Sequence, residues 1–268
     1  MNDALGVSAF STIHFSLDDD LGFWRSAGIT NVGLSWQKLE AAGPAAAVRV
    51  RDAGLRITSV LARGFPLDQS NEWPAHEHRL QTAVDAAISL DAECFAMTTG
   101  CAGAMTWEAA ADAFAAATEP VIASCRAAGI PLAVEHTNSL RVDIGFLHSL
   151  RDAVDLTRAL GIGVVMECNA CWAERDLANT IAAGIDVIRL VQVSDYTIGS
   201  LSTPDRCVPG DGDIPLARIV GRLLRAGYAG VFELELIGPR IEAEGYASAI
   251  PRAVNAMEAM LAEEQARV

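Results

Sequence analysis

Short apolar runs alternate along the whole chain with longer segments in which apolar residues recur at helical spacing. The runs are rich in β-branched residues, which is typical of buried strands, and they occupy 5–10, 30–36, 55–62, 94–100, 131–138, 163–169, 188–195 and 230–238. Helical periodicity is clearest over 18–27, 107–128, 143–160 and 215–226. The pattern therefore predicts a strand and a helix in alternation from one end to the other.

Glycines mark the predicted ends of the helices. Each lies shortly before an apolar run, at Gly28, Gly54, Gly129, Gly161, Gly184 and Gly227. Glycine can adopt the left-handed conformation that closes a helix, so a strand can begin at once. The segment Leu90-Asp91-Ala92 is the one predicted transition without a glycine. At a helix start, Ser16 with Asp19 three residues later predicts a capping box.

Eight strand–helix units in about 260 residues favour a closed (β/α)₈ barrel, the TIM barrel, over other α/β folds. An open doubly wound sheet is the competitor. It usually carries a glycine-rich loop after its first strand, and residues 7–11 contain no glycine. Because no linker or change in composition interrupts the pattern, we expect one barrel domain over 1–268.

Composition and charge narrow the possible partners. The chain has 268 residues, with Lys+Arg 20 against Asp+Glu 34 and a net charge of -14, so we expect no nucleic-acid partner. Apolar stretches are too short for a membrane span, and the first residues do not resemble a signal peptide. We therefore expect a cytoplasmic protein whose six cysteines are free thiols.

Oxygen-bearing side chains occupy the carboxyl ends of four consecutive predicted strands, where barrel enzymes place their active sites. They are Glu135, Glu167, Gln192 and Glu235. An ion pair with arginine often explains one such acid, whereas four oxygen donors at one height are costly to bury unless they bind a cation. Oxygen-only ligation favours a hard divalent metal ion, with Mn²⁺ the best fit and Mg²⁺ the second, over Zn²⁺.

Three segments in the second half of the chain resemble a known family. They are GIPLAVEHTN, DRCVPGDGDIPL and GYAGVFELELIG, within roughly 125–240. They are similar to the corresponding stretches of the xylose isomerase-like superfamily, and within it to the sugar-phosphate isomerases and epimerases. This resemblance implies that Glu135 and Glu235 are both metal ligands and the catalytic acid/base pair.

The resemblance also assigns roles to further residues. Glu167 stands where the family has an Asp, and Gln192 stands where a His is usual; both would be metal ligands. Arg206, shortly before a Pro-Gly-Asp-Gly segment, would hold a substrate oxygen or carboxylate. A family histidine three residues after the strand-six acid is replaced by Ala170, which puts that substrate contact in doubt.

Several other residues near predicted strand ends are candidate substrate contacts. They are His14, Trp36, Lys38, Trp107, His136 and Trp172. Each has an ordinary alternative: core or loop packing for the tryptophans, a loop position for His14, a solvated helix turn for Lys38, and an outward direction for His136. Glu233 shares a strand face with Glu235 but lies deeper, so it either orients the site or marks a bulge. The rim loops contain few phosphate-binding signals, which favours a substrate without phosphate.

These features predict a metal-dependent isomerase or epimerase of a small polyhydroxy carbonyl compound. A cation held by adjacent carbonyl and hydroxyl oxygens would stabilise an enediolate, while two glutamates move the proton. A lyase or dehydratase of the inosose or dehydroshikimate type uses the same residues and stays open. A non-catalytic partner subunit is a third possibility, and a DNA-repair nuclease is disfavoured because only five histidines are present. The acidic segment 241–266 is interpreted as one solvated helix, and a homo-oligomer is possible.

Overall fold

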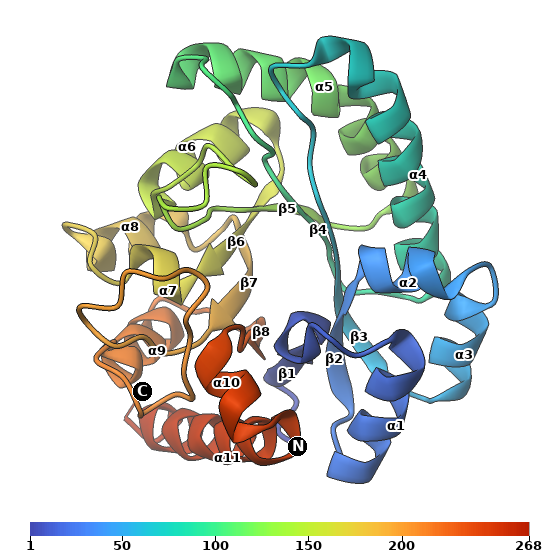
Figure 1. Ribbon diagram of the computed structural model, residues 1–268. Coiled ribbons are helices and arrows are strands. Elements are labelled where there is room, and N and C mark those ends of the chain that lie inside the picture. Colours follow the sequence, from blue (N-terminus) through green and yellow to red (C-terminus); the bar gives the residue numbers. More distant parts are fainter. Residues whose placement is uncertain (268) are drawn as a thin grey trace.

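Eight parallel strands close into a barrel in chain order in the computed structural model, which describes residues 1–267 (Figure 1). Strand β1 pairs with β2 on one side and with β8 on the other, which closes the ring. The strands are β1 Leu5–Ser8, β2 Asn31–Ser35, β3 Arg56–Ala62, β4 Phe95–Thr98, β5 Leu132–Glu135, β6 Gly163–Glu167, β7 Ile188–Val193 and β8 Val231–Leu234. The predicted (β/α)₈ barrel is confirmed. Of the expected domain, only residue 268 lies outside the described residues.

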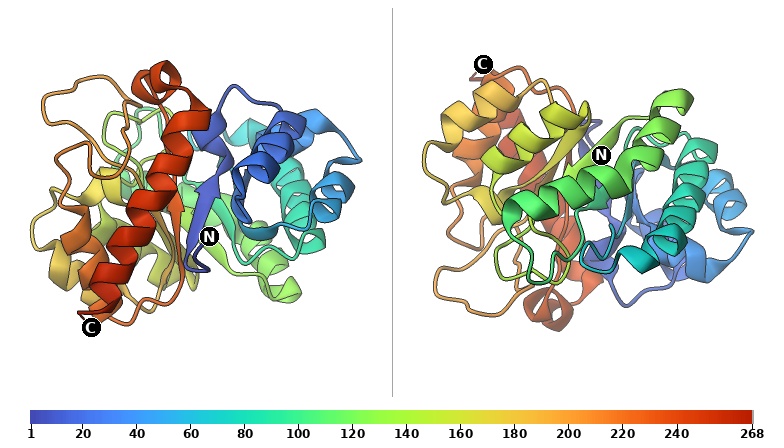
Figure 2. Two further views of the ribbon diagram at one scale, coloured as in Figure 1. Left: turned by 90° about the horizontal axis from the view of Figure 1, so that it is seen from below. Right: turned by 90° about the horizontal axis from the view of Figure 1, so that it is seen from above.

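Helices surround the barrel (Figure 2). Most of the apolar core lies between them and the outer face of the strands. They are α1 Leu17–Ala27, α2 Trp36–Ala42, α3 Ala46–Asp52, α4 Trp73–Ser89, α5 Trp107–Ala128, α6 Leu150–Leu160, α7 Cys168–Cys171, α8 Leu177–Gly184, α9 Leu216–Arg225, α10 Pro239–Glu244 and α11 Tyr246–Gln265, with 3₁₀ turns at Ala9–Thr12 and Ser70–Glu72. No helix among residues 1–267 has the length and apolar character needed to cross a bilayer. All six cysteines in this range are free thiols, as expected.

Two predicted helices differ from the structure. The segment 143–160 becomes helical only at Leu150, where the Ser149 side chain accepts a hydrogen bond from the Asp152 backbone and caps α6. The residues before it form a loop over the barrel end, held by a hydrogen bond from the Phe146 backbone N–H to the Thr99 hydroxyl. The segment 241–266 is not one helix, because Gly245, at φ +87°, separates α10 from α11.

The helix-ending glycines behave largely as predicted. Gly28, Gly54, Gly129, Gly161 and Gly227 all have positive φ angles. Gly184 instead stays within α8, and its missing side chain serves packing, because a Cβ there would lie 2.5 Å from a methyl group of Val154. At the transition that lacks a glycine, Asp91 takes the left-handed conformation itself, at φ 54°.

Glu233 lies inside the barrel, buried below the carboxyl ends of the strands. Its Oε2 accepts hydrogen bonds from the hydroxyls of Thr58 at 2.7 Å and Ser59 at 3.0 Å. Both neighbours reach it because the register between β2 and β3 shifts by one residue after Val32, which creates a bulge on β3. Gly33 on β2 leaves the space that the carboxylate fills.

This arrangement predicts that Gly33→Ala destabilises the barrel. The added Cβ would lie 2.2 Å from Glu233 Oε1 and 2.4 Å from Cδ. Because the carboxylate is buried and hydrogen-bonded, it cannot move aside freely. We expect the free energy of unfolding to fall by about 1–3 kcal/mol, measured by denaturant unfolding.

Gly22→Ala is the matched control, because Gly22 lies within α1 and a Cβ added there would meet only open space. It should leave the stability unchanged or raise it by up to about 1 kcal/mol. Equal stabilities of the two variants would contradict the role assigned to Gly33.

Candidate functional site

The strand ends bring the predicted glutamates together by simple alternation. Ala133, Val165, Leu190 and Val231 belong to the apolar cluster inside the barrel. Residues two positions further along a strand face the same side, so Glu135, Glu167 and Gln192 point inward at the ends of β5, β6 and β7, and Glu235 does so just beyond β8. One carboxylate oxygen from each of the three glutamates lies within 4.8 Å of the others. All four side chains are buried.

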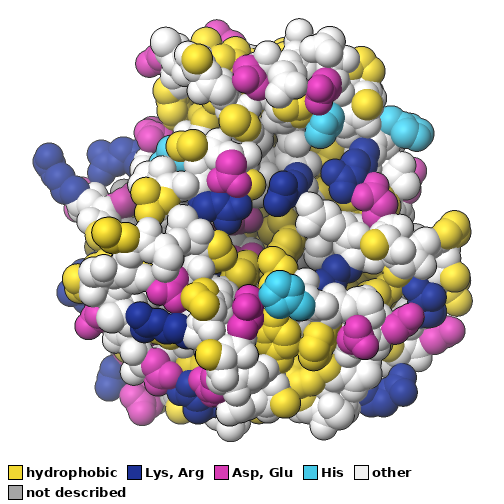
Figure 3. Space-filling view, in the orientation of Figure 1, with side chains coloured by type: hydrophobic (Ala, Val, Ile, Leu, Met, Phe, Trp, Pro, Cys, Tyr) yellow, Lys and Arg dark blue, Asp and Glu magenta, His cyan; other side chains and the backbone are white. Residues whose placement is uncertain are grey.

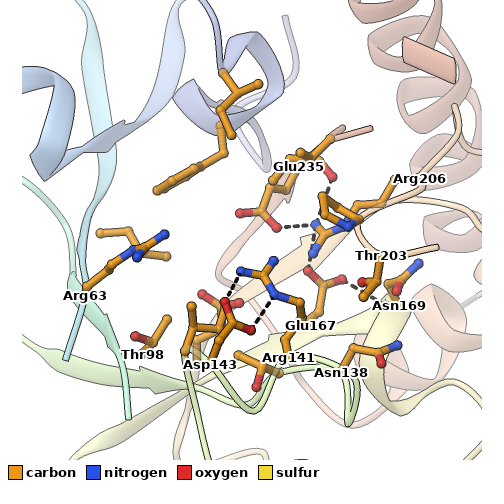
Figure 4. Close-up of a pocket in the computed structure, with 18 residues that line it drawn as sticks. Arg63, Thr98, Asn138, Arg141, Asp143, Glu167, Asn169, Thr203, Arg206 and Glu235 are labelled. Atoms are coloured by element: carbon orange, nitrogen blue, oxygen red, sulfur yellow. Dashed lines mark hydrogen bonds and ion pairs between the residues drawn. The ribbon is translucent and has the colours of Figure 1, made fainter. Parts of the chain in front are cut away.

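Arg206 lies among these carboxylates (Figure 4). Its Nη1 is 2.9 Å from Glu167 Oε2, forms an ion pair with the Glu235 carboxylate, and donates to the Glu235 backbone oxygen at 3.0 Å. One guanidinium therefore contacts two of the three acids. The ion-pair alternative considered for a single glutamate accounts for only part of the cluster.

Charge repulsion and burial raise the pKa values of Glu135 and Glu167. Burial, with the nearby charges of Glu235 and Glu167, raises the pKa of Glu135 well above its usual range. Burial raises the pKa of Glu167 to about 8, even though Arg206 acts in the opposite direction. The site therefore favours an additional positive charge, either a proton or a cation.

Gln192 supplies a further oxygen. Its Nε2 lies 3.4 Å from Glu235 Oε1, while its Oε1 is buried and has no hydrogen-bond partner among residues 1–267. A buried carbonyl oxygen without a donor is costly, and a cation would satisfy it. The donor set therefore fits a divalent metal ion.

Asp195 builds the loop that presents Arg206. Its carboxylate accepts backbone N–H bonds from Tyr196, Gly210, Gly212 and Ile214, at 2.8 to 3.1 Å. A backbone bridge joins Asp195 to Cys207, the residue after Arg206. The Arg206 N–H also donates to the Ile237 oxygen at 2.9 Å. The Pro-Gly-Asp-Gly segment thus folds around one buried carboxylate, which fixes the start of the arginine side chain.

A cavity of about 480 Å³ opens above the cluster. Figure 3 shows this face hollowed near its centre, with Lys or Arg side chains beside the hollow. Glu135, Glu167, Glu235 and Arg206 line the cavity, and its apolar wall consists of Phe10, Ile13, Leu61, Ile144, Pro204 and Ile237. The volume suits a small, sugar-sized molecule.

Other polar residues of the cavity were missed by the sequence analysis. They are Arg63, Thr98, Thr137, Asn138, Arg141, Asp143, Asn169 and Thr203. Arg63 directly follows the last residue of β3, the same signal that identified the glutamates, so it was open to prediction. Asp143 was hidden because the segment from 143 onward was interpreted as helix, and Arg141 lies between that segment and the strand run that ends at 138.

The fold agrees with comparisons against known proteins. The family model described as "Xylose isomerase-like TIM barrel" matches residues 24–260. The chain belongs to this family. An inosose isomerase of Halalkalibacterium halodurans is 25% identical over 115 residues, which is 41% of each chain.

Two solved structures have the same barrel. The structure of an IOLI protein with a bound zinc atom has a TM-score of 0.82 at 14% identity, covering 97% of this chain and 99% of the other. An L-ribulose 3-epimerase has a TM-score of 0.75 at 19% identity, with coverage of 98% and 96%. At these identities the likeness shows the fold. The neighbours of this xylose isomerase-like protein include isomerase and epimerase types.

Lys38 of this xylose isomerase-like barrel lies outside the cavity that holds the glutamates. Its ammonium donates to the backbone oxygens of Ala9 at 2.9 Å and Thr12 at 2.8 Å, and to Asp20 Oδ2 at 2.7 Å. An ammonium group has three N–H donors, and these contacts use them. Lys38 therefore joins α2 to α1 and the first 3₁₀ turn, and it lines a neighbouring pocket that shares Phe10 and Ile13 with the cavity of the glutamates.

The two candidate histidines also lie outside that cavity. His14 is exposed and lies 3.2 Å from Glu242. His136 is fully buried, and its Nε2 accepts the Glu167 backbone N–H at 3.2 Å. Burial lowers the pKa of His136 to about 3, so its ring is neutral. His136 thus faces outward, as strand alternation indicates, and its hydrogen bond holds the backbone at the end of β6.

Within the described residues 1–267, the lining of the cavity includes none of the three candidate tryptophans. Trp36 is buried in the core, and the partly buried Trp172 packs against that core. Trp107 packs edge-on against Phe146 and is 40% exposed. The apolar wall expected from these indole rings is instead formed by aliphatic side chains, Pro204 and Phe10.

The raised carboxyl pKa values predict that metal-free protein loses stability as the pH rises. Glu167 holds its proton to about pH 8 in the folded state, whereas an unfolded chain releases it near 4.5. Its contribution is fully present below 4.5 and is lost as pH increases toward 8, by at most about 1.4 kcal/mol per pH unit. In thermal denaturation, Glu167→Gln should therefore gain stability relative to wild type between pH 5 and 8.

Glu77→Gln, at an exposed position on α4 outside the glutamate cluster, is the control for the loss of one carboxylate. Saturating Mn²⁺ should reduce the pH dependence of the wild-type protein, because the cation replaces the proton. A wild-type stability that rises relative to Glu167→Gln over this range would contradict the assignment.

Proposed function

We propose that this protein is a divalent-metal-dependent isomerase or epimerase of a small polyhydroxy carbonyl compound. The observation that carries the proposal is the convergence of three buried glutamates within 4.8 Å at the floor of a sugar-sized cavity. Membership of the xylose isomerase-like family and the partial match to an inosose isomerase support the same reaction class.

The metal would be held by Glu135, Glu167, Glu235 and the free carbonyl oxygen of Gln192. Carboxylate and amide oxygens are hard donors, so we propose Mn²⁺ first and Mg²⁺ second. When bound, such a cation polarises a substrate carbonyl and stabilises the negative charge that forms as the adjacent carbon loses its proton.

Glu135 and Glu235 are proposed to move that proton. Strands β5 and β8 are not neighbours in the barrel, so the two carboxylates approach the cavity from different sides. One can accept a proton from carbon on one face, and the other can return a proton on the opposite face or at the next carbon. Return to the same carbon gives epimerisation, and return to its neighbour exchanges ketose and aldose.

Arg206 is proposed to bind the substrate. Its side chain is 14% exposed and lines the cavity. The Asp195 loop and the Ile237 carbonyl hold its backbone, and Glu167 and Glu235 hold its guanidinium. It can donate to a substrate oxygen while its contact with Glu235 orients that carboxylate. The apolar wall of the cavity limits access of water to the reacting carbon.

The proposal predicts that Glu135→Gln and Glu235→Gln each abolish proton exchange. The Mn²⁺-loaded protein would be incubated in D₂O with keto-sugars and inososes, and NMR would follow deuterium entry next to the carbonyl. Loss of a general acid or base should slow exchange by about 10²–10⁴-fold. The exposed control Glu77→Gln should match wild type.

Product analysis in the same samples separates the related reactions. An isomer or epimer supports the proposal, whereas release of water without an isomer would replace it with the lyase function. Substantial exchange that persists in Glu135→Gln and Glu235→Gln would contradict the roles of these glutamates.

A further inference from the structure

Two arginines at the mouth of the cavity have no role in the proton transfer described above. Arg63 follows β3, and Arg141 belongs to the loop after β5; both line the cavity that holds the glutamates. Figure 4 shows Arg141 beside Asp143, with Arg63 apart from both at the edge of the cavity. With Arg206 on the floor, three guanidiniums border a space of about 480 Å³.

The loop of Arg141 is held in place by the barrel. The Gly100 N–H donates to the Ile144 oxygen at 2.9 Å, and the Ile144 N–H donates to the Arg141 oxygen at 3.1 Å. Asp143 accepts from Arg141 Nε at 2.8 Å and Nη2 at 2.9 Å. The Nη1 group of Arg141 has no hydrogen-bond partner among residues 1–267, so a fixed and half-buried guanidinium keeps donors for a ligand.

Arg63 is less constrained. It is exposed at the cavity edge and forms no hydrogen bond or ion pair within the described part of the chain. Its charge acts on the same carboxylate that Arg141 binds, because both arginines lower the pKa of Asp143. The charges of both guanidiniums therefore act on Asp143.

The charge balance of the cavity depends on the metal. The lining holds four carboxylates, on Glu135, Asp143, Glu167 and Glu235, and three guanidiniums. A bound divalent cation would leave this lining with one excess positive charge, in a chain whose net charge is -14. A neutral sugar needs no such excess, whereas an anionic group would neutralise it.

We propose that Arg63 and Arg141 bind an anionic group of the substrate, which is thus an α-hydroxy carbonyl compound bearing a carboxylate or a phosphate. The inference rests on the proposed function for the placement of the carbonyl end. The carbonyl end meets the glutamates at the floor, and the anionic end meets the two arginines at the mouth. A planar guanidinium pairs with either anion through two parallel N–H bonds.

Binding of three small probes to the Mn²⁺-loaded protein tests this assignment. Dihydroxyacetone, hydroxypyruvate and dihydroxyacetone phosphate share a hydroxy carbonyl unit and carry no charge, a carboxylate and a phosphate, respectively. Isothermal titration calorimetry should give at least tenfold tighter binding for one of the anionic probes than for dihydroxyacetone. The probe that binds more tightly identifies the source of the anionic group.

Arginine variants then test whether Arg63 and Arg141 cause the tighter binding of the anionic probe. In the double variant Arg63→Met with Arg141→Met, the affinity for the anionic probe should fall to within about threefold of the affinity for dihydroxyacetone. The affinity for dihydroxyacetone itself should not change. Arg63→Lys should keep part of the preference, since it keeps the charge. Arg218→Met, at an exposed position on α9, is the matched control and should behave as wild type.

The remaining outcomes overturn the proposal. Anionic probes that bind no tighter than dihydroxyacetone would exclude an anion subsite while leaving the proposed function intact. A preference that survives the double variant would show that the metal alone binds the anion. If none of the three probes binds, the proposed function fails together with this inference.

Discussion

The crowding of three buried carboxylates at one end of the barrel is the constraint on which the functional part of this structure depends. Oxygens of Glu135, Glu167 and Glu235 lie within 4.8 Å of one another, and all three side chains are buried. Like charges at this separation and burial repel strongly and require a compensating positive charge. Arg206 compensates in part, protons on Glu135 and Glu167 compensate further in metal-free protein, and a divalent cation would satisfy the site completely.

Much of the surrounding chain serves to keep these groups in place. Asp195 folds the loop that carries Arg206, and buried His136 accepts the backbone N–H of Glu167. Deeper in the barrel, Glu233 adds another buried acid, and it is stabilised differently, by hydroxyl groups and by the space at Gly33. The barrel thus separates a polar layer that is satisfied by its own hydrogen bonds from a layer above it in which we propose a metal ion.

The strand ends and the cluster could be predicted from the sequence because both follow from periodicity. Glu135 and Glu167 end apolar runs, and parallel strands in a barrel bring such ends to one height. The loop over 138–146 could not be predicted in this way. Its path is determined by contacts with Thr99 and Gly100, which are distant in sequence, and its own pattern of apolar and polar residues does not reveal these contacts. The ion pair between Lys38 and Asp20 could not be predicted from the local sequence pattern either. Arg63 could have been predicted, because it directly follows a strand end.

Anomalous diffraction from crystals grown with Mn²⁺ tests the central claim most directly, because it locates the ion without requiring a substrate. The account predicts one strong peak bounded by the carboxylates of Glu135, Glu167 and Glu235 and by the side-chain oxygen of Gln192. Crystals with saturating Mn²⁺ but no peak at this position, and with Arg206 still contacting both Glu167 and Glu235, would contradict it.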